Sequence, residues 1–353
     1  MFAPKAHAPR APQMATPVVA CCWALLTVLS ANIACAEDTV VYRSTNAPGK
    51  TTQKTGEVID FNGLELRLLQ TNGRETAIAT ERILRVKTPK TRAHLQGNQL
   101  YAAHQFQEAL RHYAQAIREE QRTWVRRQIL VQQIWCARNL GQIEVAGDQF
   151  TLVLLKSDPQ TQYFDAIPLA WSPQAVSGAR EQRAQKWLAA DQPASKLLGA
   201  SWLLSTNQQA TAVATLRQLA TAKDKRIALL AEAQTWRTQV ITARETDVAR
   251  WQQVIAATPA ELQGGPLYVL AKAQQRLGRS DQAALSYLRL PILFPNNRPL
   301  AASALLAAGD TLAPSHPADA RQMYQELVRD YAETSQAANA KQQLAKLKDE
   351  SKE

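Results

Sequence analysis

The chain has 353 residues, 46% of them hydrophobic, and a formal net charge of +11. The positive excess is spread along the chain without a block, which is typical of a solvated surface and, as a second interpretation, of weak attraction to anionic polymers. The sequence lacks an aromatic-plus-basic motif of the RNA-binding type. We therefore expect no nucleic-acid partner.

Residues 1–36 have the layout of an export signal. Lys5 and Arg10 form a basic start, the run VVACCWALLTVL is apolar, and the Ala-Cys-Ala of residues 34–36 fits a small-residue cleavage site. Two alternatives stay open. One is a lipoprotein signal ending at Cys35, which Asn32 disfavours; the other is an uncleaved anchor, because the apolar run approaches the ~20 residues that span a bilayer. The pattern predicts an exported protein, periplasmic or associated with the cell envelope, with no membrane span in the mature chain unless the signal is retained.

Cysteine usage indicates how the fold is held. Three of the four cysteines fall within residues 1–36, so Cys136 stands alone in the mature chain and burial has to hold the fold. Its neighbours Ile134 and Ala137 favour a small buried hydrophobe over a nucleophile. An intermolecular disulfide in an oxidising compartment is the alternative.

Residues 37–91 follow the alternating pattern of β-strands. Short segments rich in Val, Ile and Leu are separated by Asn62-Gly63 and Asn72-Gly73, which are strong hairpin signals because both residue types accept positive φ. The stretch GEVIDFNGLELRLLQTNGRETAIATERILRVKT resembles the Sm-like or SH3-like small β-domains of exported bacterial proteins. We expect four or five strands in a small antiparallel β-barrel-like domain. It either caps the helical part, the favoured role because terminal repeats need a polar cover, or forms a second binding module.

From residue 92 the chain follows a helical repeat. The stretch AHLQGNQLYAAHQFQEALRHYAQAI resembles a tetratricopeptide repeat (TPR), and the first residue of its second-helix face recurs along the chain. These markers are Ala109, Ala146, Ala212, Asp247, Ala283 and Ala320. The gap between Ala146 and Ala212 is close to twice the family period of about 34 residues, so a degenerate seventh hairpin is expected there. The resemblance implies a mainly α protein: a TPR-like right-handed α-solenoid of about six to seven helical hairpins.

Each marker begins a face that we expect to be buried. In the second and fourth units these faces are Ala146, Phe150 and Val153, and Asp247, Trp251 and Val254; in the last two they are Ala283, Tyr287 and Leu290, and Ala320, Tyr324 and Leu327. Twelve residues before four of the six markers stands a Gly or Ala, as close helix packing requires. The repeats are therefore expected to seal one another from water.

Residues 157–173, SDPQTQYFDAIPLAWSP, interrupt this array. Three prolines and several aromatic residues show no helical period, and we expect a bridge between a first TPR pair at 92–156 and the repeats at 174–348. Long loops also line binding sites, which is the alternative. Later helices are expected at 174–190, 193–205, 208–222, 225–242 and 245–257. The last helix, with Ala337, Ala340, Leu344 and Leu347 on one face, is expected to cap the array before a frayed tail at 349–353.

The sequence contains no HExxH, paired CxxC, G-x-S-x-G or phosphate-cradling Gly loop. Three histidines, His94, His104 and His112, cluster in the first repeat, but they lack the spacing and donor set of a metal site, so we expect them at the surface. We predict no enzyme, no catalytic residue, no cofactor and no metal.

These features predict a non-catalytic periplasmic scaffold that binds a peptide or partner protein of the cell envelope in the concave groove of the solenoid. The alternative is a basic adaptor that attaches to an anionic envelope polymer through the β-domain and solenoid surface. Expected partner-binding residues are polar or aromatic positions just off the packed seam of the first helices: Asn98, Tyr101, Gln132, Trp135, Trp202, Lys272 and Gln275. For Trp135 and Trp202, ordinary packing between repeats is the competing interpretation.

Two narrower resemblances guide this prediction. The chaperone-binding TPR clamp for a carboxylate is not carried over, because His94 stands where that family has Lys. The stretch ADARQMYQELVRDYAETSQAANAKQQL is similar to repeats of exported TPR proteins such as the lipoprotein of the outer-membrane barrel assembly machine and the Tol-Pal coordinating protein, although Ala332 replaces their usual Pro. The similarity favours an envelope setting over any particular machine.

Overall fold

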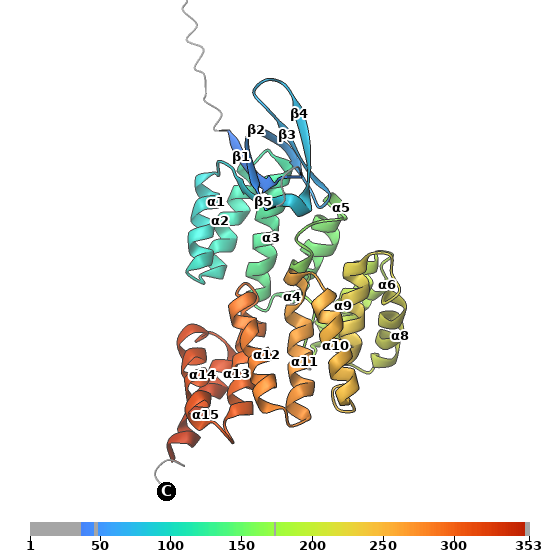
Figure 1. Ribbon diagram of the computed structural model, residues 1–353, viewed down its shortest axis with the longest axis vertical. Helices are drawn as coiled ribbons and strands as arrows, with labels where there is room; N and C mark the ends of the chain where they lie inside the picture. Colours follow the sequence, from blue (N-terminus) through green and yellow to red (C-terminus); the bar gives the residue numbers. More distant parts are fainter. Residues whose placement is uncertain (1–36, 46–48, 173, 350–353) are drawn as a thin grey trace, which may run out of the picture. The chain divides into compact units, whose positions relative to one another are not determined.

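A computed structural model (Figure 1) describes residues 37–45, 49–172 and 174–349. The expected signal at 1–36, its cleavage site and residues 350–353 of the expected tail lie outside these ranges. Within them the protein is mainly helical: a small antiparallel sheet is followed by successive antiparallel helix pairs. No helix in the described ranges is both long enough and apolar enough to cross a bilayer.

The sheet has five strands: β1 (Asp38–Arg43), β2 (Thr51–Phe61), β3 (Glu65–Leu69), β4 (Glu75–Ala79) and β5 (Ile83–Lys87). Their order is β4-β3-β2-β1-β5, with every neighbouring pair antiparallel. The expectation of a barrel was therefore wrong. A barrel needs its two edge strands to pair, but β4 and β5 are the edges of this sheet, and the 3-10 turn Thr80–Arg82 joins them without pairing.

Strand β2 is shared between two halves of the sheet. Its first part, Thr51–Gly56, pairs with β1, and the part from Glu57 pairs with β3. The change occurs at Gly56, where φ is 155° and a Cβ would lie 2.2 Å from the Leu69 carbonyl oxygen. Glycine is required here because the backbone of β3 occupies the space that a side chain would need.

We expect Gly56→Ala to reduce the free energy of unfolding by about 1–3 kcal/mol, because the methyl group forces β2 and β3 apart. Urea unfolding of both chains measures the change. Gly178→Ala, a position with no heavy atom within 4 Å of the added Cβ, is the matched control and should stay within about 0.5 kcal/mol. Equal effects at the two sites would show that the strands do not approach closely at Gly56.

The buried face of the sheet packs on the first helices. Val58, Leu66 and Leu68 share one apolar cluster with Trp124 and Ile129. Trp124 also donates from Nε1 to the Val58 carbonyl oxygen at 2.9 Å, so the strand backbone is bonded to α3 (Thr123–Asn139) as well as packed on it. In Figure 1 the strands lie directly against α3. This contact supports the interpretation of the sheet as a cap.

The helices form pairs joined by short turns. They are α1 (Arg92–Ala102), α2 (Phe106–Glu119), α3 (Thr123–Asn139), α4 (Ile143–Asp148), which continues through a π-helical turn (Gln149–Leu154) into α5 (Leu155–Ser157), α6 (Gly178–Ala189), α7 (Pro193–Leu203), α8 (Gln209–Leu219), α9 (Lys225–Trp236), α10 (Glu245–Ala257), α11 (Gly264–Arg276), α12 (Ser280–Leu293), α13 (Arg298–Leu312), α14 (Pro317–Asp330) and α15 (Ser335–Asp349). We call α1, α3, α7, α9, α11 and α13 the first helices of their pairs.

The alanine markers are packed as the repeat pattern predicts. Five of them have no exposed surface: Ala109, Ala146, Ala212, Ala283 and Ala320. Two glycines show how close this packing is. A Cβ at Gly97, twelve residues before Ala109, would lie 2.6 Å from Tyr113, and a Cβ at Gly309, eleven residues before Ala320, would lie 2.4 Å from Tyr324. Helix backbones therefore approach directly onto tyrosine rings.

Two of the predicted faces are correct in part: Ala146, Phe150 and Trp251 are buried, and the other positions are displaced by one residue. The π-helical turn in the second pair inserts one extra residue, so Leu154 is buried and Val153 is 50% exposed. In the fourth unit Asp247 bonds the Arg244 backbone N–H at the helix start, and Val248 takes the buried marker position. A constant repeat period in the sequence predicts neither displacement.

The expected seventh hairpin has only one helix. The described residues of 158–172 and 174–177 contain a single 3-10 turn, Phe164–Ala166, and α6 packs on α7 as the one helix described for this unit. Three prolines within 157–173 account for the missing helix, since each removes a backbone donor. Helix α9 also ends at Trp236 instead of residue 242.

The expected last helix is present as α15. Ala337, Ala340 and Leu347 are buried and Leu344 is partly buried, so the predicted face is correct.

Candidate functional site

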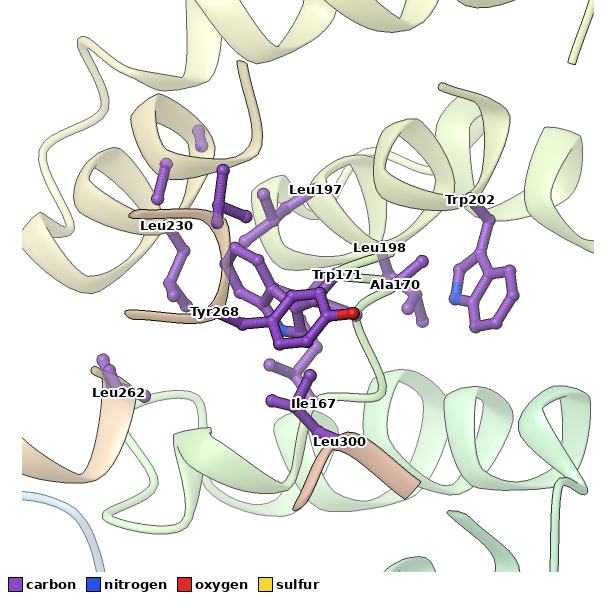
Figure 2. Close-up of a cluster of buried hydrophobic side chains, with 14 of the residues drawn as sticks. Ile167, Ala170, Trp171, Leu197, Leu198, Trp202, Leu230, Leu262, Tyr268 and Leu300 are labelled. Carbon is purple, nitrogen blue, oxygen red and sulfur yellow. The ribbon is translucent and has the colours of Figure 1, made fainter. Parts of the chain in front are cut away.

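The irregular segment, residues 158–172, runs through the inside of the helical array. Phe164, Ile167 and Trp171 are each at most 8% exposed. Figure 2 shows Ile167, Ala170 and Trp171 of this segment among side chains of three first helices and the start of α13: Leu197, Leu198, Trp202, Leu230, Tyr268 and Leu300. The segment is thus a part of the core as well as a connection.

Side chains of the first helices bond the backbone of this segment. From α7, Ser201 Oγ accepts from the Ala170 N–H at 2.9 Å, and Trp202 Nε1 donates to the Pro168 carbonyl oxygen at 2.9 Å. Gln234 of α9 donates to the Ala170 carbonyl oxygen at 2.9 Å. Arg138 of α3 donates to the Asp165 carbonyl oxygen, also at 2.9 Å. A non-helical stretch of chain therefore has its backbone groups satisfied by helix side chains.

A cavity of about 390 Å³, cavity A, opens beside the start of this segment. Four carboxamides line it, together with three tyrosines, two apolar or aromatic residues of α3 and one carboxylate. The complete lining is Asn98, Tyr101, Tyr113, Gln128, Val131, Gln132, Trp135, Tyr163, Asp165 and Asn296. Residues far apart in sequence thus converge on one space rich in groups that both donate and accept hydrogen bonds.

Asn296, from the turn between α12 and α13, closes one side of cavity A. Tyr101 donates from its hydroxyl to Asn296 Oδ1 at 3.2 Å, and Asn139 Nδ2 donates to the Asn296 carbonyl oxygen at 3.1 Å. The next residue but one, Arg298, lies 3.1 Å from His104 Nε2 and also pairs with Glu333. The first helix pair and the turn before α13 are therefore in direct contact.

Two further cavities follow the segment. Cavity B, about 140 Å³, shares Trp135, Asp165 and Asn296 with cavity A. Cavity C, about 380 Å³, lies beyond Arg138 and Trp171, which it shares with cavity B, and shares no residue with cavity A. The inner surface thus offers two separate spaces of similar size on either side of a small one.

The structure brings four of the seven expected site residues together. Asn98, Tyr101, Gln132 and Trp135 all line cavity A. Trp202 lines cavity C instead. Lys272 and Gln275 line none of the three cavities: Lys272 lies over the Tyr268 ring at 5.9 Å, and Gln275 accepts from the Tyr287 hydroxyl at 3.1 Å. Gln275 therefore takes part in packing between α11 and α12, and Lys272 contacts a residue of its own helix, α11.

The two tryptophans have packing roles and also border cavities. Trp202 is 3% exposed and bonds Pro168, and the Arg180 guanidinium lies 4.9 Å from its ring centroid. Trp135 is 8% exposed, with the Arg138 guanidinium 4.0 Å from its ring centroid. Packing therefore accounts for most of the surface of both rings, and each presents a remaining edge to a cavity.

Arg138 is buried and Asp165 is partly buried, and each affects the charge of the other. Burial lowers the pKa of Arg138 to about 10, and the Asp165 charge opposes this effect. Burial raises the pKa of Asp165 to about 6; the Arg138 charge acts against the shift and the Glu261 charge adds to it. A carboxyl group with a pKa near 6 changes charge within the range that many cells and compartments experience.

We expect Asp165 to make folding weaker as the pH rises from about 4 to about 6. Its folded-state pKa of about 6 exceeds the ordinary value of 3.8, so the folded chain binds the proton more tightly and loses stability as that proton leaves. In Asp165→Asn this loss disappears. The unfolding free energy of the variant minus that of the native chain should therefore increase from pH 4 to pH 6 and stay constant above pH 6. Urea unfolding at pH 4, 5, 6 and 7 tests the slope. Asp191→Asn, at an exposed position, should run parallel to the native chain.

The histidines do not share one environment. His94 was expected at the surface but is 1% exposed, bonded to Gln132 at 3.1 Å, with its pKa lowered to about 4 chiefly by burial.

Cys136 is buried as predicted, and burial raises its pKa to about 12, which disfavours the thiolate. Within the described ranges no group of three or more His, Cys, Asp or Glu side chains is arranged to hold a metal ion.

The expected site residues do not include six that line cavity A: Tyr113, Gln128, Val131, Tyr163, Asp165 and Asn296. Gln128 lies four residues before Gln132 on α3, so helical spacing from one predicted residue was a signal that points to it. Asn296 carries no such signal, because only the contact between the α12–α13 turn and α1 brings it to the cavity.

A scan against protein-family models gives no match for this chain, and a search of curated proteins gives no match either.

Proposed function

We propose that the chain is a non-catalytic binding protein that holds an extended segment of a partner protein in cavity A, on the first helices of a TPR-like array. The observation that carries this proposal is the set of four carboxamides around one cavity: Asn98, Gln128, Gln132 and Asn296. A peptide backbone presents one donor and one acceptor per residue. The side-chain oxygens of Asn98, Gln132 and Asn296 already contact Tyr113, His94 and Tyr101, so their NH2 groups are the donors that a partner's carbonyl oxygens would accept from. Tyr101 and Trp135 add the rigid aromatic surface typical of binding sites.

The chain itself provides an example of this type of recognition. Residues 167–170 follow the 3-10 turn Phe164–Ala166 and lie against first helices; side chains of Arg138, Ser201 and Gln234 bond backbone groups of Asp165 and Ala170. A partner segment bound in cavity A would continue this arrangement from Tyr163 of the irregular segment toward α1. The partner's backbone would then be recognised in the same way, and its side chains would meet Tyr101 and Trp135.

Photo-crosslinking in cells that produce the full chain tests the proposal. p-Benzoylphenylalanine at Tyr101, which lines cavity A, should give a crosslink to a partner protein, whereas the same group at the exposed Arg111 of α2 should not. Mass spectrometry of the crosslinked peptide should identify a segment of that partner. Crosslinks of equal yield at both positions, or none at Tyr101, would contradict a peptide site in cavity A.

A matched pair of substitutions sharpens the test. Gln128→Leu removes a carboxamide from cavity A at nearly constant volume and should lower the Tyr101 crosslink about fivefold, as expected for about 1 kcal/mol of lost hydrogen bonding. Gln99→Leu makes the same change at an exposed position of α1 and should leave the yield unchanged. If both variants behave alike, the carboxamides do not recognise the partner.

We also propose that the partner belongs to the cell envelope, on the strength of the export-like N-terminus. The alternative function, attachment to an anionic polymer, predicts that binding weakens steeply with salt, since it depends on the basic surface. Recognition by the uncharged carboxamides of cavity A predicts little change. Repeating the crosslinking experiment in cell extracts at low and high salt distinguishes the two functions.

A further inference from the structure

We infer that cavity C is a second binding site, for the carboxylate of an organic monoanion with an apolar body. It is a separate site from the proposed peptide cavity, since the two share no lining residue. Its described lining contains two arginines, Arg138 and Arg180, and no Asp or Glu. Charge complementarity therefore selects an anionic occupant.

Arg138 is the central group of the site. Its side chain is buried, with the residue 6% exposed, and its Nη1 donates to the Asp165 carbonyl oxygen at 2.9 Å. Among the described residues this is its one hydrogen bond, which leaves Nε and Nη2 without a protein acceptor. Neither nitrogen is among the fully enclosed unpartnered side-chain atoms of the described residues, so solvent reaches both of them and an anion can take the place of that solvent. The planar fork of a guanidinium matches the two oxygens of a carboxylate.

The surrounding helices add positive potential. Residues from the first turns of three helices line cavity C: Arg180 of α6, Pro299 and Leu300 of α13, and Ser335 and Gln336 of α15. The N-terminal end of a helix carries a partial positive charge and favours an anion nearby. Three such ends and an incompletely bonded arginine thus act in the same direction.

The remaining lining indicates what the anion is attached to. Ile143, Leu169, Trp171, Trp202 and Leu300 give cavity C an apolar wall, and serine and carboxamide groups line the rest. Arg180 already pairs with Glu144 at 2.9 Å, and the Arg138 charge interacts with that of Asp165 without a hydrogen bond between the two side chains. The positive charge left for a ligand is therefore small, which suits a monoanion better than a phosphate dianion, whose desolvation needs more donors.

Two sources share this chemistry: the carboxyl terminus of a peptide, and a small free carboxylic acid. Ligand-observed NMR titration of the purified full chain distinguishes these two sources. The ligands are N-acetyl-leucine, acetyl-Ala-Ala-Ala-Leu with a free carboxyl group, and the carboxamide of each. We expect the acids to bind at least about tenfold more tightly than the matching amides, as for the loss of one charge-assisted pair. Tighter binding of the tetrapeptide identifies the first source, and equal binding the second. Equal affinity for acids and amides, no binding of either acid, or tighter binding of inorganic phosphate overturns the inference.

Substitutions place the binding in cavity C. Arg138→Met should weaken both acids at least about tenfold. Because Arg138 also holds the irregular segment, Ser335→Glu provides a second variant: Ser335 is exposed at the first position of α15, where a Glu is favourable for the helix, and its carboxylate would repel the ligand. It should weaken the acids severalfold without changing the thermal midpoint. Asn339→Glu, exposed on the same helix and outside the lining, is the charge-matched control. Equal binding by the two Glu variants contradicts the assignment. Ser335 lies outside the lining of cavity A, so Ser335→Glu should leave the crosslink at Tyr101 unchanged, and failure here and failure of the peptide proposal are separable.

Discussion

Replacing Trp171 by Ala should destabilise the protein by about 3–5 kcal/mol, the usual cost of removing a large buried aromatic side chain. The indole is 8% exposed and lies so close to α11 that a Cβ at Gly265 would be 1.8 Å from its Cε2 atom. Its removal leaves a space next to the backbone of α11 that a helix cannot easily fill. Urea unfolding followed by circular dichroism measures the loss.

The control for Trp171→Ala lies three residues further along the chain. Gln174→Ala, at an exposed position, should change the free energy of unfolding by no more than about 0.5 kcal/mol. A small effect at Trp171 as well would mean that residues 158–172 are only a surface connection. Cavities A and C would then not have the lining described above.

Tyr287→Ala should also reduce the free energy of unfolding by about 3–5 kcal/mol. Tyr287 has no exposed surface, packs edge-to-face with Tyr268 at a centroid distance of 5.6 Å, and donates to Gln275 at 3.1 Å. The lost side chain therefore removes both the contact between α11 and α12 and a hydrogen bond. Thermal melts and urea unfolding measure the change.

Tyr287→Phe separates the two contributions. It keeps the ring and removes only the hydroxyl, so a loss of about 1 kcal/mol is expected, the typical net contribution of one hydrogen bond. Tyr324→Ala should behave like Tyr287→Ala, because Tyr324 is 1% exposed and donates to Asp310 at 2.7 Å. No loss in either alanine variant would refute the packed face of the last repeats.

The candidate site shows how far a residue pattern can be extended. Helical periodicity and an assumed groove led to Asn98, Tyr101, Gln132 and Trp135, and these four do line one cavity. The same reasoning also selected Lys272 and Gln275, which pack within their own helix pair. Periodicity identifies the face of a helix, but which neighbouring element covers that face depends on how the chain folds back on itself.

Two predicted faces were displaced for a local reason. The π-helical turn before Leu154 and the capping contact of Asp247 each move the buried position by one residue. Both depend on hydrogen bonds between particular backbone groups, and these leave no mark on the hydrophobic period.

The sequence by itself determined the strands of residues 38–87, the helix pairs and their small-residue contacts, because these follow from local propensity and a repeating apolar pattern. Only the tertiary structure decided that the sheet stays open and that residues 158–172 run inside the array. The physical reason is the backbone of that proline-interrupted segment, in which local turns satisfy only some of the donors and acceptors. Its acceptors at Asp165, Pro168 and Ala170 are satisfied by side chains from α3, α7 and α9. Such partners lie tens of residues away, and no local pattern reports them.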